Sequence, residues 1–242
     1  GVPESQINLA IVLKMNDLFG LYGIAPVLLR EEDVSLHDDS AVTLREKKVS
    51  DLKNRVEAIE SLERVVLFSI HQNTFSDQKY HGAQAFYAPT EGSQKLAASI
   101  QNAIRMTIQP DNSRQEKKIP DSVYLMNHIS CPAVLVECGF LTNPGEEAQL
   151  LDSGYQKKMA AVLVSGGLKE FKKLMSADEV GGTALVGISK PVIKAHGSSD
   201  AYAIKNAVRQ AKQYVSSGII ESIAENIDVM RLDAPSHAAE EN

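Results

Sequence analysis

Cysteine is scarce in this 242-residue chain, which contains only Cys131 and Cys138. Two cysteines without a C-x-x-C pair exclude a disulfide framework and give no sign of a structural metal site built on thiolates. No apolar run approaches the roughly 20 residues that a membrane-spanning helix requires. Basic residues are also fewer than acidic ones: 25 Lys and Arg against 31 Asp and Glu give a formal net charge of −6. Because nucleic-acid binding needs a basic face, nucleic acid is not expected as the main partner.

The remaining composition is that of an ordinary globular protein, with 43% hydrophobic and 23% charged residues. This length allows one good hydrophobic core, or one domain with a small appendage. The chain begins at Gly1 without a methionine and without a signal-like segment, so the amino terminus predicts no compartment.

Helical and strand patterns alternate over residues 1–171. Apolar residues at helical spacing predict helices within 7–18, 49–59, 96–107 and 155–171. Short apolar runs predict strands at 24–29, 65–70, 83–87, 123–126 and 133–136. The polar stretch 109–122 predicts a long surface loop, of a kind that is usually functional or disordered. The alternation predicts an α/β domain in which helices flank a mostly parallel or mixed sheet.

The pattern changes near residue 172. Two short apolar runs, 183–188 and 191–195, are joined by a two-residue link, which predicts a pair of strands in a hairpin. Two helical stripes follow, and the tail 229–242 is acidic and predicted to be disordered. Two strands and two helices, over 172–228, make a small core for an independent domain. The stripes consist of Ile204, Val208, Ala211 and Val215, then Ile219, Ile223 and Ile227.

Two of the expected strands end in side chains that are suited to chemistry. His71 follows the run 65–70, and Glu137 follows the run 133–136. Sites in α/β proteins form at the carboxyl ends of strands. Zinc hydrolysis needs an imidazole to hold the ion and a carboxylate to take the proton of its water. Each residue alone is also consistent with an ordinary polar strand end, but the two together favour a hydrolytic site.

Four segments of residues 1–171 together resemble a known family. They are E-S-Q-I-N-L-A from Glu4, S-I-H-Q-N from Ser69, G-A-Q-A-F-Y from Gly82 and V-E-C-G-F-L-T-N from Val136. The resemblance is to the zinc-dependent N-acetylmuramoyl-L-alanine amidases, the bacterial cell-wall hydrolases, and most of all to the branch associated with spore-cortex maturation. It implies that Glu4 and His71 are zinc ligands and that Glu137 is the catalytic carboxylate. It also implies peptidoglycan or a muropeptide as the substrate, and an extracytoplasmic or cell-wall location.

The sequence departs from this family at one zinc ligand. The family's first histidine lies in a glycine-rich D-P-G-H-G-G segment that ends a central opening strand, and no such segment stands in this chain. His37, His81 and His128 lie in other contexts. Catalytic zinc takes three protein ligands. The resemblance therefore implies an amidase domain that lacks its first strand and its third zinc ligand, and whose activity is impaired.

Arg114 stands in the polar stretch 109–122. If this stretch borders the substrate groove, Arg114 could bind an acidic carboxylate of the peptide stem. The alternative is a merely solvated loop.

Residues 172–228 contain the segments G-G-T-A-L-V-G from Gly181 and K-P-V-I-K-A-H-G-S-S from Lys190. With these segments they resemble the carboxyl end of the phosphate acyltransferases, which make acyl phosphates from acyl-carrier-protein thioesters and inorganic phosphate for phospholipid synthesis. This resemblance implies acyl-carrier protein as a partner and a cytoplasmic location. The H-G-S-S turn before a helix suits an anion. A plain helix cap by Ser198, Ser199 or Asp200 is the alternative.

The two resemblances predict a fusion of two unrelated pieces, either natural or an artefact of joined gene fragments. Three functions follow from them. The first is a peptidoglycan amidase that is incomplete at its metal site. The second is an acyltransferase remnant, and the third is a non-catalytic fusion relic.

Overall fold

The computed structural model describes residues 3–174, 182–185, 190, 192–195, 199, 201–218 and 220. The chain divides into two compact units. The first comprises Gly1–Phe19 and Pro26–Ser176, and the second comprises Gly20–Ala25 and Ala177–Asn242. Within the described ranges, no helix has both the length and the apolar character needed to cross a membrane.

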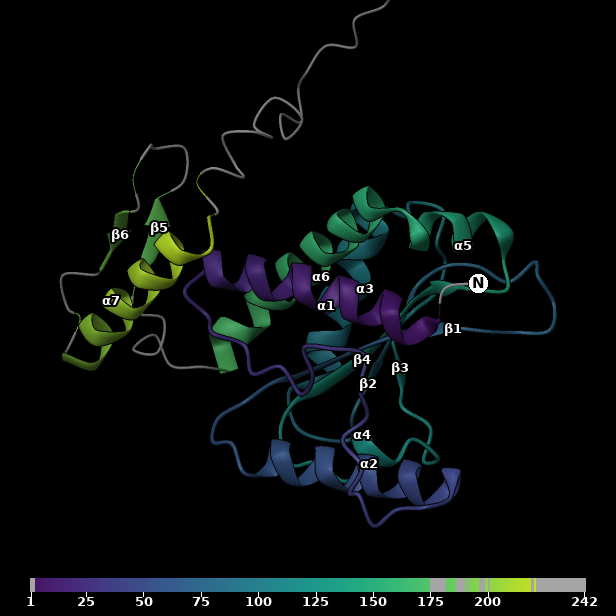
Figure 1. The fold of residues 1–242 in the computed structure, drawn as a ribbon. Helices are drawn as coiled ribbons and strands as arrows, with labels where there is room; N and C mark the ends of the chain where they lie inside the picture. Colours follow the sequence, from purple (N-terminus) through teal and green to yellow (C-terminus); the bar gives the residue numbers. More distant parts are fainter. Residues whose placement is uncertain are drawn as a thin grey trace, which may run out of the picture. The chain divides into compact units, whose positions relative to one another are not determined.

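A four-stranded mixed sheet forms the centre of the first unit, in the order β1-β4-β2-β3. Strand β1 runs parallel to β4, β4 antiparallel to β2, and β2 parallel to β3. Helices α1, α3 and α6 lie on one side of this sheet, and α2 and α4 on the other (Figure 1). The strands are β1 (Leu67–Asn73), β2 (Gln84–Tyr87), β3 (Lys117–Lys118) and β4 (Ala133–Phe140). The helices are α1 (Glu4–Leu21), α2 (Leu44–Glu60), α3 (Ser93–Thr107), α4 (Tyr124–Asn127), α5 (Pro144–Leu151) and α6 (Ser153–Leu174).

Strand β4 is buried because helices cover both faces of the sheet. Val134 and Val136 are fully buried. On the opposite face, Leu135 packs in one cluster with Ile59 of α2 and Met126 of α4. A strand with apolar residues on both faces reads as a continuous hydrophobic run, as the sequence predicts here. The expected fold class, an α/β domain with a mixed sheet flanked by helices, is confirmed.

Side-chain caps fix the starts of two helices. Thr43 Oγ1 accepts a hydrogen bond from the Glu46 N–H at 3.2 Å, and Glu46 Oε2 accepts one from the Thr43 N–H at 2.8 Å. This reciprocal pair is a capping box, which begins α2. Asn143 caps α5, with its Oδ1 accepting from the Gly145 N–H at 3.0 Å and with Pro144 at the first helical position.

Helices α3 and α6 pack closely because α6 has glycine at the point of contact. A Cβ atom on Gly166 would lie 2.9 Å from the Ala103 Cβ and 2.9 Å from the Ile100 Cα. Ser99 Oγ donates a hydrogen bond to the Gly166 carbonyl at 2.6 Å. The two helices are therefore so close at this point that only glycine fits between their backbones.

Gly166→Val is expected to lower the free energy of unfolding by about 1–3 kcal/mol, because the added methyls overlap the α3 backbone, which cannot rotate away. Ser165→Val is the matched control, since Ser165 is exposed on the same helix. We expect the control to change stability by less than about 0.5 kcal/mol. Chemical denaturation of both variants measures the difference, and equal stabilities would contradict the close approach.

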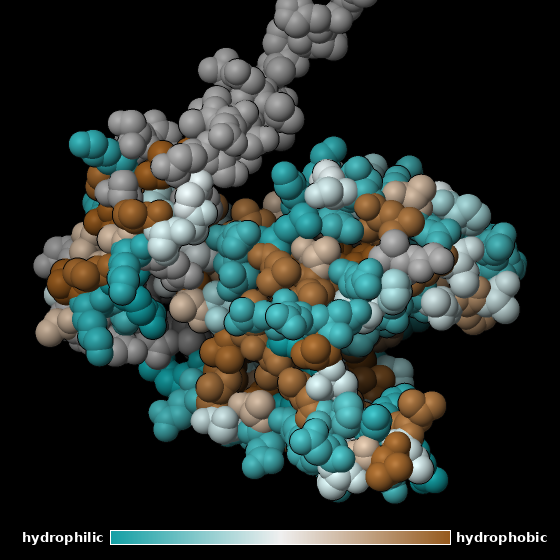
Figure 2. All heavy atoms as spheres, viewed as in Figure 1, coloured by the Kyte–Doolittle hydropathy of each residue, from teal (hydrophilic) through white to brown (hydrophobic). Residues whose placement is uncertain are grey.

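Two of the expected strands are wrong. Residues 24–29 form no strand: the run is divided between the two units after Ala25, and Pro26 has no N–H to donate to a ladder. Val27 of this run is 64% exposed. Figure 2 shows apolar side chains gathered on the surface between α1 and α2, the two helices that this part of the chain connects.

The second wrong strand is 123–126, most of which lies in helix α4. Periodicity cannot distinguish strand from helix in so short an apolar run. Asn127 Nδ2 donates to the Val123 carbonyl at 2.8 Å and to the Pro120 carbonyl at 3.0 Å, which holds the short helix. The expected loop 109–122 contains β3, which pairs with Phe86 and Tyr87 of β2.

The second unit contains the antiparallel strands β5 (Thr183–Leu185) and β6 (Val192–Lys194) and the helix α7 (Ala201–Ser216). The expected strand pair and first helix are thus confirmed, with shorter strands. Gln210 of α7 is buried; in the orientation that satisfies its amide, it donates to the Gly182 carbonyl at 3.1 Å and accepts from the Gly23 N–H at 2.9 Å. The stripe 219–227 and the tail 229–242 lie outside the described residues, apart from Ile220.

Candidate active site

His71 and Glu137 lie side by side near the carboxyl ends of β1 and β4. They are paired in register across these two parallel strands. Residues paired in register project from the same face of a sheet, so the two side chains share one face. Gln84 of β2 pairs with Glu137 from the other side. The sheet thus brings an imidazole, a carboxyl and an amide together in one row.

Glu4 is the first residue of α1 and reaches the same place. Its Oε1 lies 3.2 Å from His71 Nδ1 and accepts a hydrogen bond from the Gln72 backbone N–H at 3.1 Å. Asn8, one turn further along, donates to the same oxygen at 3.0 Å. The hydrogen bond with His71, helped by those from Asn8 and Gln72, lowers the pKa of Glu4 to about 2 against the opposing effect of burial. Glu4 is therefore a carboxylate at neutral pH, which the start of a helix also favours.

Glu137 titrates in the opposite direction. Burial raises its pKa to about 7; His71 opposes this rise and the negative charge of Glu4 adds to it. Glu137 Oε2 is buried and accepts no hydrogen bond from the described residues. A buried carboxylate oxygen without a donor is costly, so the neutral form is favoured. A carboxyl group that titrates near neutrality can both accept and return a proton.

A chain of amide hydrogen bonds holds the Glu4–His71 pair. Gln72 Nε2 donates to Asn8 Oδ1 at 3.0 Å, and Asn8 in turn donates to Glu4. Both amides are buried. The sequence argument missed these positioning residues. Asn8 follows Glu4 at an i, i+4 spacing, and in a helix this spacing could have predicted their hydrogen bond.

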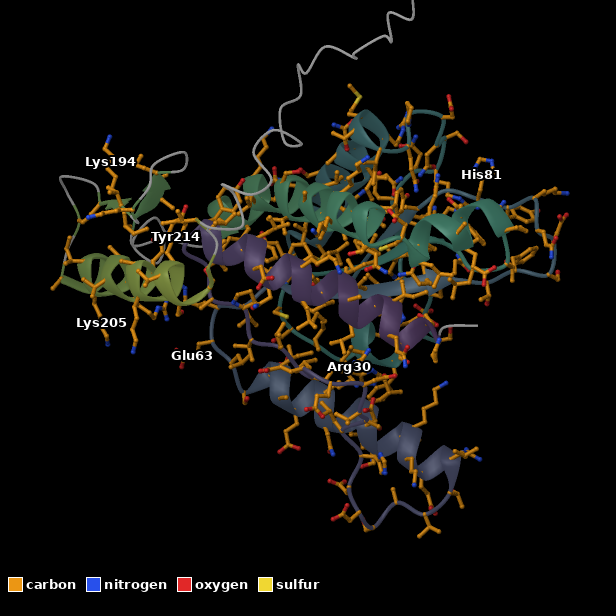
Figure 3. All side chains as sticks on the ribbon, turned by 45° about the horizontal axis from the view of Figure 1, so that its top comes forward. Arg30, Glu63, His81, Lys194, Lys205 and Tyr214 are labelled. Atoms are coloured by element: carbon orange, nitrogen blue, oxygen red, sulfur yellow. The ribbon has the colours of Figure 1, made fainter. Side chains whose placement is uncertain are left out.

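Arg30 holds the start of α1 from outside (labelled in Figure 3). Its Nη2 donates to the Ser5 carbonyl at 2.7 Å, and its Nη1 donates to Asp33 Oδ1 at 3.0 Å. Ser5 Oγ donates to the other oxygen of Asp33 at 3.0 Å. This triangle fixes the residue next to Glu4, and the sequence argument did not predict it either.

Arg114 lies beside the same strand ends. Its Nη1 donates to Gln84 Oε1 at 3.1 Å, and its Nε donates to the His81 carbonyl at 2.8 Å. Its guanidinium lies over the ring of Phe140, 4.7 Å from the ring centre. Gln84 is the strand partner of Glu137, so Arg114 contacts one end of the row formed by His71, Glu137 and Gln84. Its contact with substrate stays a prediction.

Glu4 and His71 have donor atoms that suit zinc, which binds imidazole nitrogen and carboxylate oxygen. Within the described part of the chain, no group of three or more His, Cys, Asp or Glu residues is placed to hold a metal ion. His37 contacts Ser35, and the His128 ring stacks on Tyr124. Catalytic zinc takes three protein ligands and a water. Glu4 and His71 fit as two ligands, and the described residues supply no third.

Residues 1–168 match the family model of the N-acetylmuramoyl-L-alanine amidases. The chain belongs to this family. It is 32% identical over 169 residues to the germination-specific N-acetylmuramoyl-L-alanine amidase of Bacillus subtilis, a match that covers 69% of this chain and 70% of that protein.

Solved amidase structures share the fold. The CwlD amidase of Clostridioides difficile, solved in complex with the GerS lipoprotein, has a TM-score of 0.68 and 36% identity over 72% of this chain and 89% of that one. An N-acetylmuramoyl-L-alanine amidase of Clostridium difficile 630 has a TM-score of 0.58 and 26% identity, over 69% of this chain and 83% of that one.

Residues 148–222 match a second family model, described as a fatty acid synthesis protein. The phosphate acyltransferase of Thermoanaerobacter pseudethanolicus is 51% identical over 73 residues. That match covers 30% of this chain but only 22% of the acyltransferase, so the chain spans less than a quarter of that relative's length. The expected resemblance to both families is confirmed. Of the expected H-G-S-S turn, only Ser199 lies among the described residues.

Proposed function

We propose that the first unit is a zinc-dependent peptidoglycan hydrolase, which cleaves the amide between N-acetylmuramic acid and L-alanine. Membership of the amidase family supports the class of reaction. The observation that carries the proposal is the in-register pairing of His71 with Glu137, with Glu4 hydrogen-bonded to His71. The substrate is peptidoglycan or a muropeptide.

In this proposal Glu137 carries the proton. Its pKa of about 7 leaves a useful fraction as carboxylate at neutral pH, and its Oε2 has no donor among the described residues. The carboxylate takes the proton of the attacking water and returns it to the departing L-alanine amine. Glu4 and His71 would hold the zinc ion, which when bound polarises the amide carbonyl. Arg114 binds a carboxylate of the peptide stem.

The direct test is digestion of purified peptidoglycan by the full chain with excess zinc. An amidase releases new L-alanine amino groups and no reducing sugar ends. We expect slow release of amino groups that requires zinc and disappears in His71→Ala. Release of reducing ends, or release that persists after zinc is removed, would contradict the proposal.

The second unit has an alternative function. Its 51% identity to a phosphate acyltransferase makes an acyl-carrier-protein thioester and inorganic phosphate its candidate substrates. Phosphate-dependent consumption of that thioester tests this alternative. Because 78% of that relative's length is unmatched, we propose that the unit is a non-catalytic remnant.

A further inference from the structure

Two exposed aromatic side chains stand beside the candidate site, and none of the proposed catalytic roles uses them. Phe75 is 51% exposed and Tyr80 is 40% exposed. Their rings meet edge to face, with centres 4.7 Å apart and planes at 74°. The Tyr80 ring also lies 6.4 Å from that of Phe140, on β4. We call these three residues the aromatic platform; Phe75 and Tyr80 form its exposed surface, and Phe140, which is 4% exposed, supports them from the core. Exposed apolar groups that are gathered in this way mark interaction sites.

The segment 74–83, which carries two of the three rings, is held in place by the first residues after β4. Side chains on a tethered segment lose little freedom on binding, so more of their contact energy remains as affinity. Exposed His81, in the same segment, is labelled in Figure 3. Four hydrogen bonds form the tether. Thr142 Oγ1 accepts from the Phe75 N–H at 3.1 Å, and Glu146 Oε1 accepts from the Gly82 N–H at 2.9 Å. Asn143 Nδ2 donates to the Gln78 carbonyl at 2.9 Å and to the Tyr80 carbonyl at 3.4 Å.

The platform continues the catalytic row along the sheet. Phe140 lies three residues beyond Glu137 on β4 and pairs with Asn73, the last residue of β1. Arg114 joins the two places, since it donates to Gln84 in the row and covers the Phe140 ring. A substrate whose amide lies at Glu137 is therefore within reach of the platform.

Cationic groups border the rings. The Lys79 amine lies 5.5 Å from the centre of the Tyr80 ring and 2.8 Å from Asp77 Oδ2. The Arg114 guanidinium covers one face of Phe140. An apolar surface with a rim of hydrogen-bond donors suits a ligand that has an apolar face and polar edges.

We propose that the aromatic platform binds a pyranose ring of the glycan strand, on the sugar side of the amide that is cleaved. This inference rests on the proposed function. The face of an aromatic ring is negative, so the C–H bonds on the apolar face of a sugar pack against it, while sugar hydroxyls can reach the Lys79 amine and the Tyr80 hydroxyl. A charged peptide stem would gain less binding free energy from an aromatic surface, and in the proposed function its carboxylate is bound by the guanidinium of Arg114.

The test uses the full chain and peptide-free glycan strands of alternating N-acetylglucosamine and N-acetylmuramic acid, with affinity measured by calorimetry. Phe75→Ala and Tyr80→Ala are each expected to weaken binding about 10-fold, as for a central aromatic contact. Tyr80→Phe keeps the ring and should keep most of the affinity, which separates ring contact from misfolding. Tyr124→Ala is the matched control, because Tyr124 lies on α4, before the amino end of β4.

A second probe, the free stem peptide, distinguishes the possible failures. We expect its affinity to be unchanged in Phe75→Ala and reduced in Arg114→Gln. Unchanged glycan affinity in both alanine variants overturns the platform and leaves the proposed amidase standing. Loss of stem-peptide affinity instead of glycan affinity assigns the rings to the peptide and also overturns it. A chain that binds neither glycan, muropeptide nor stem peptide overturns the proposed function itself.

Discussion

This chain is expected to bind zinc more weakly, and to cleave muropeptides far more slowly, than a version of the same chain that has three zinc ligands. In the proposed function Glu4 and His71 supply two zinc ligands, whereas catalytic zinc takes three. Changes to groups that only support a ligand already cost about 10–100-fold in metal affinity, so the shortage of a ligand itself should cost more. Zinc competition against a chelator of known affinity measures this directly.

Adding an upstream strand that ends in D-P-G-H-G-G should raise zinc affinity by more than about 100-fold and restore cleavage with it. Within the described residues, β1 pairs only with β4, so its other edge can accept such a strand beside His71. The control is the same extension with alanine in place of its histidine, which should restore the strand but not the metal. Tight stoichiometric zinc and full cleavage without the extension would refute this expectation.

Glu137→Gln, made in the extended chain, should lower the cleavage rate by about 10²–10⁴-fold and leave zinc affinity unchanged. Glutamine has the same shape as glutamate but cannot accept the proton of the attacking water. The wild-type rate should fall as pH is lowered, because only the ionised form of Glu137 accepts the proton. A variant that cleaves at the wild-type rate would show that Glu137 is not the proton carrier.

The effect of Glu137→Gln on the free energy of unfolding should depend on pH. The folded-state pKa of Glu137, about 7, lies above its ordinary value of 4.5, so the folded state holds this proton more tightly than the unfolded state. The stability gained from the bound proton is complete below pH 4.5 and is lost as pH rises through 7. Above pH 7, Glu137→Gln should therefore be more stable than the wild type by up to about 3 kcal/mol.

The matched control for this stability measurement is Glu147→Gln. Glu147 is exposed in the first turn of α5. We expect this change to alter stability by less than about 0.5 kcal/mol at either pH. Thermal or urea unfolding at pH 5 and pH 8 compares the three chains, and a Glu137→Gln variant that gains nothing at the higher pH would contradict the buried-carboxyl argument.

The sequence predicted the parts of the site that depend on local pattern. The runs before His71 and Glu137 are β-branched and apolar, so both strands were expected, and so was chemistry at their ends. Their pairing in register joins residues that are far apart in the chain, and no local pattern specifies it. The contact of Glu4 with His71 came only through the family resemblance, since nothing in α1 itself indicates which strand its start will meet.

The two wrong strand predictions and the missed residues also depend on contacts between distant parts of the chain. Residues 24–29 have the composition of a strand, but a strand also needs a partner edge, which composition does not reveal. The run 123–126 packs equally well as one turn of helix, with Met126 fully buried. Arg30 and Gln72 contact Ser5 and Asn8 through long-range hydrogen bonds, and such bonds leave no periodic trace in a sequence.

The second unit takes in Gly20–Ala25 as well as the chain after Ala177, so the polypeptide passes between the units three times. The buried Gln210 amide accepts its hydrogen bond from Gly23, which follows the first helix of the amidase part. The second unit is therefore built from two separate stretches of the chain and is not a single segment appended at the end of the first. A stop codon after residue 171 would leave Gly23 without this acceptor, and residues 177–242 produced alone would lack Gly20–Ala25. A single cut between residues 176 and 177 would therefore leave the second unit incomplete, because Gly20–Ala25 would stay with the first unit.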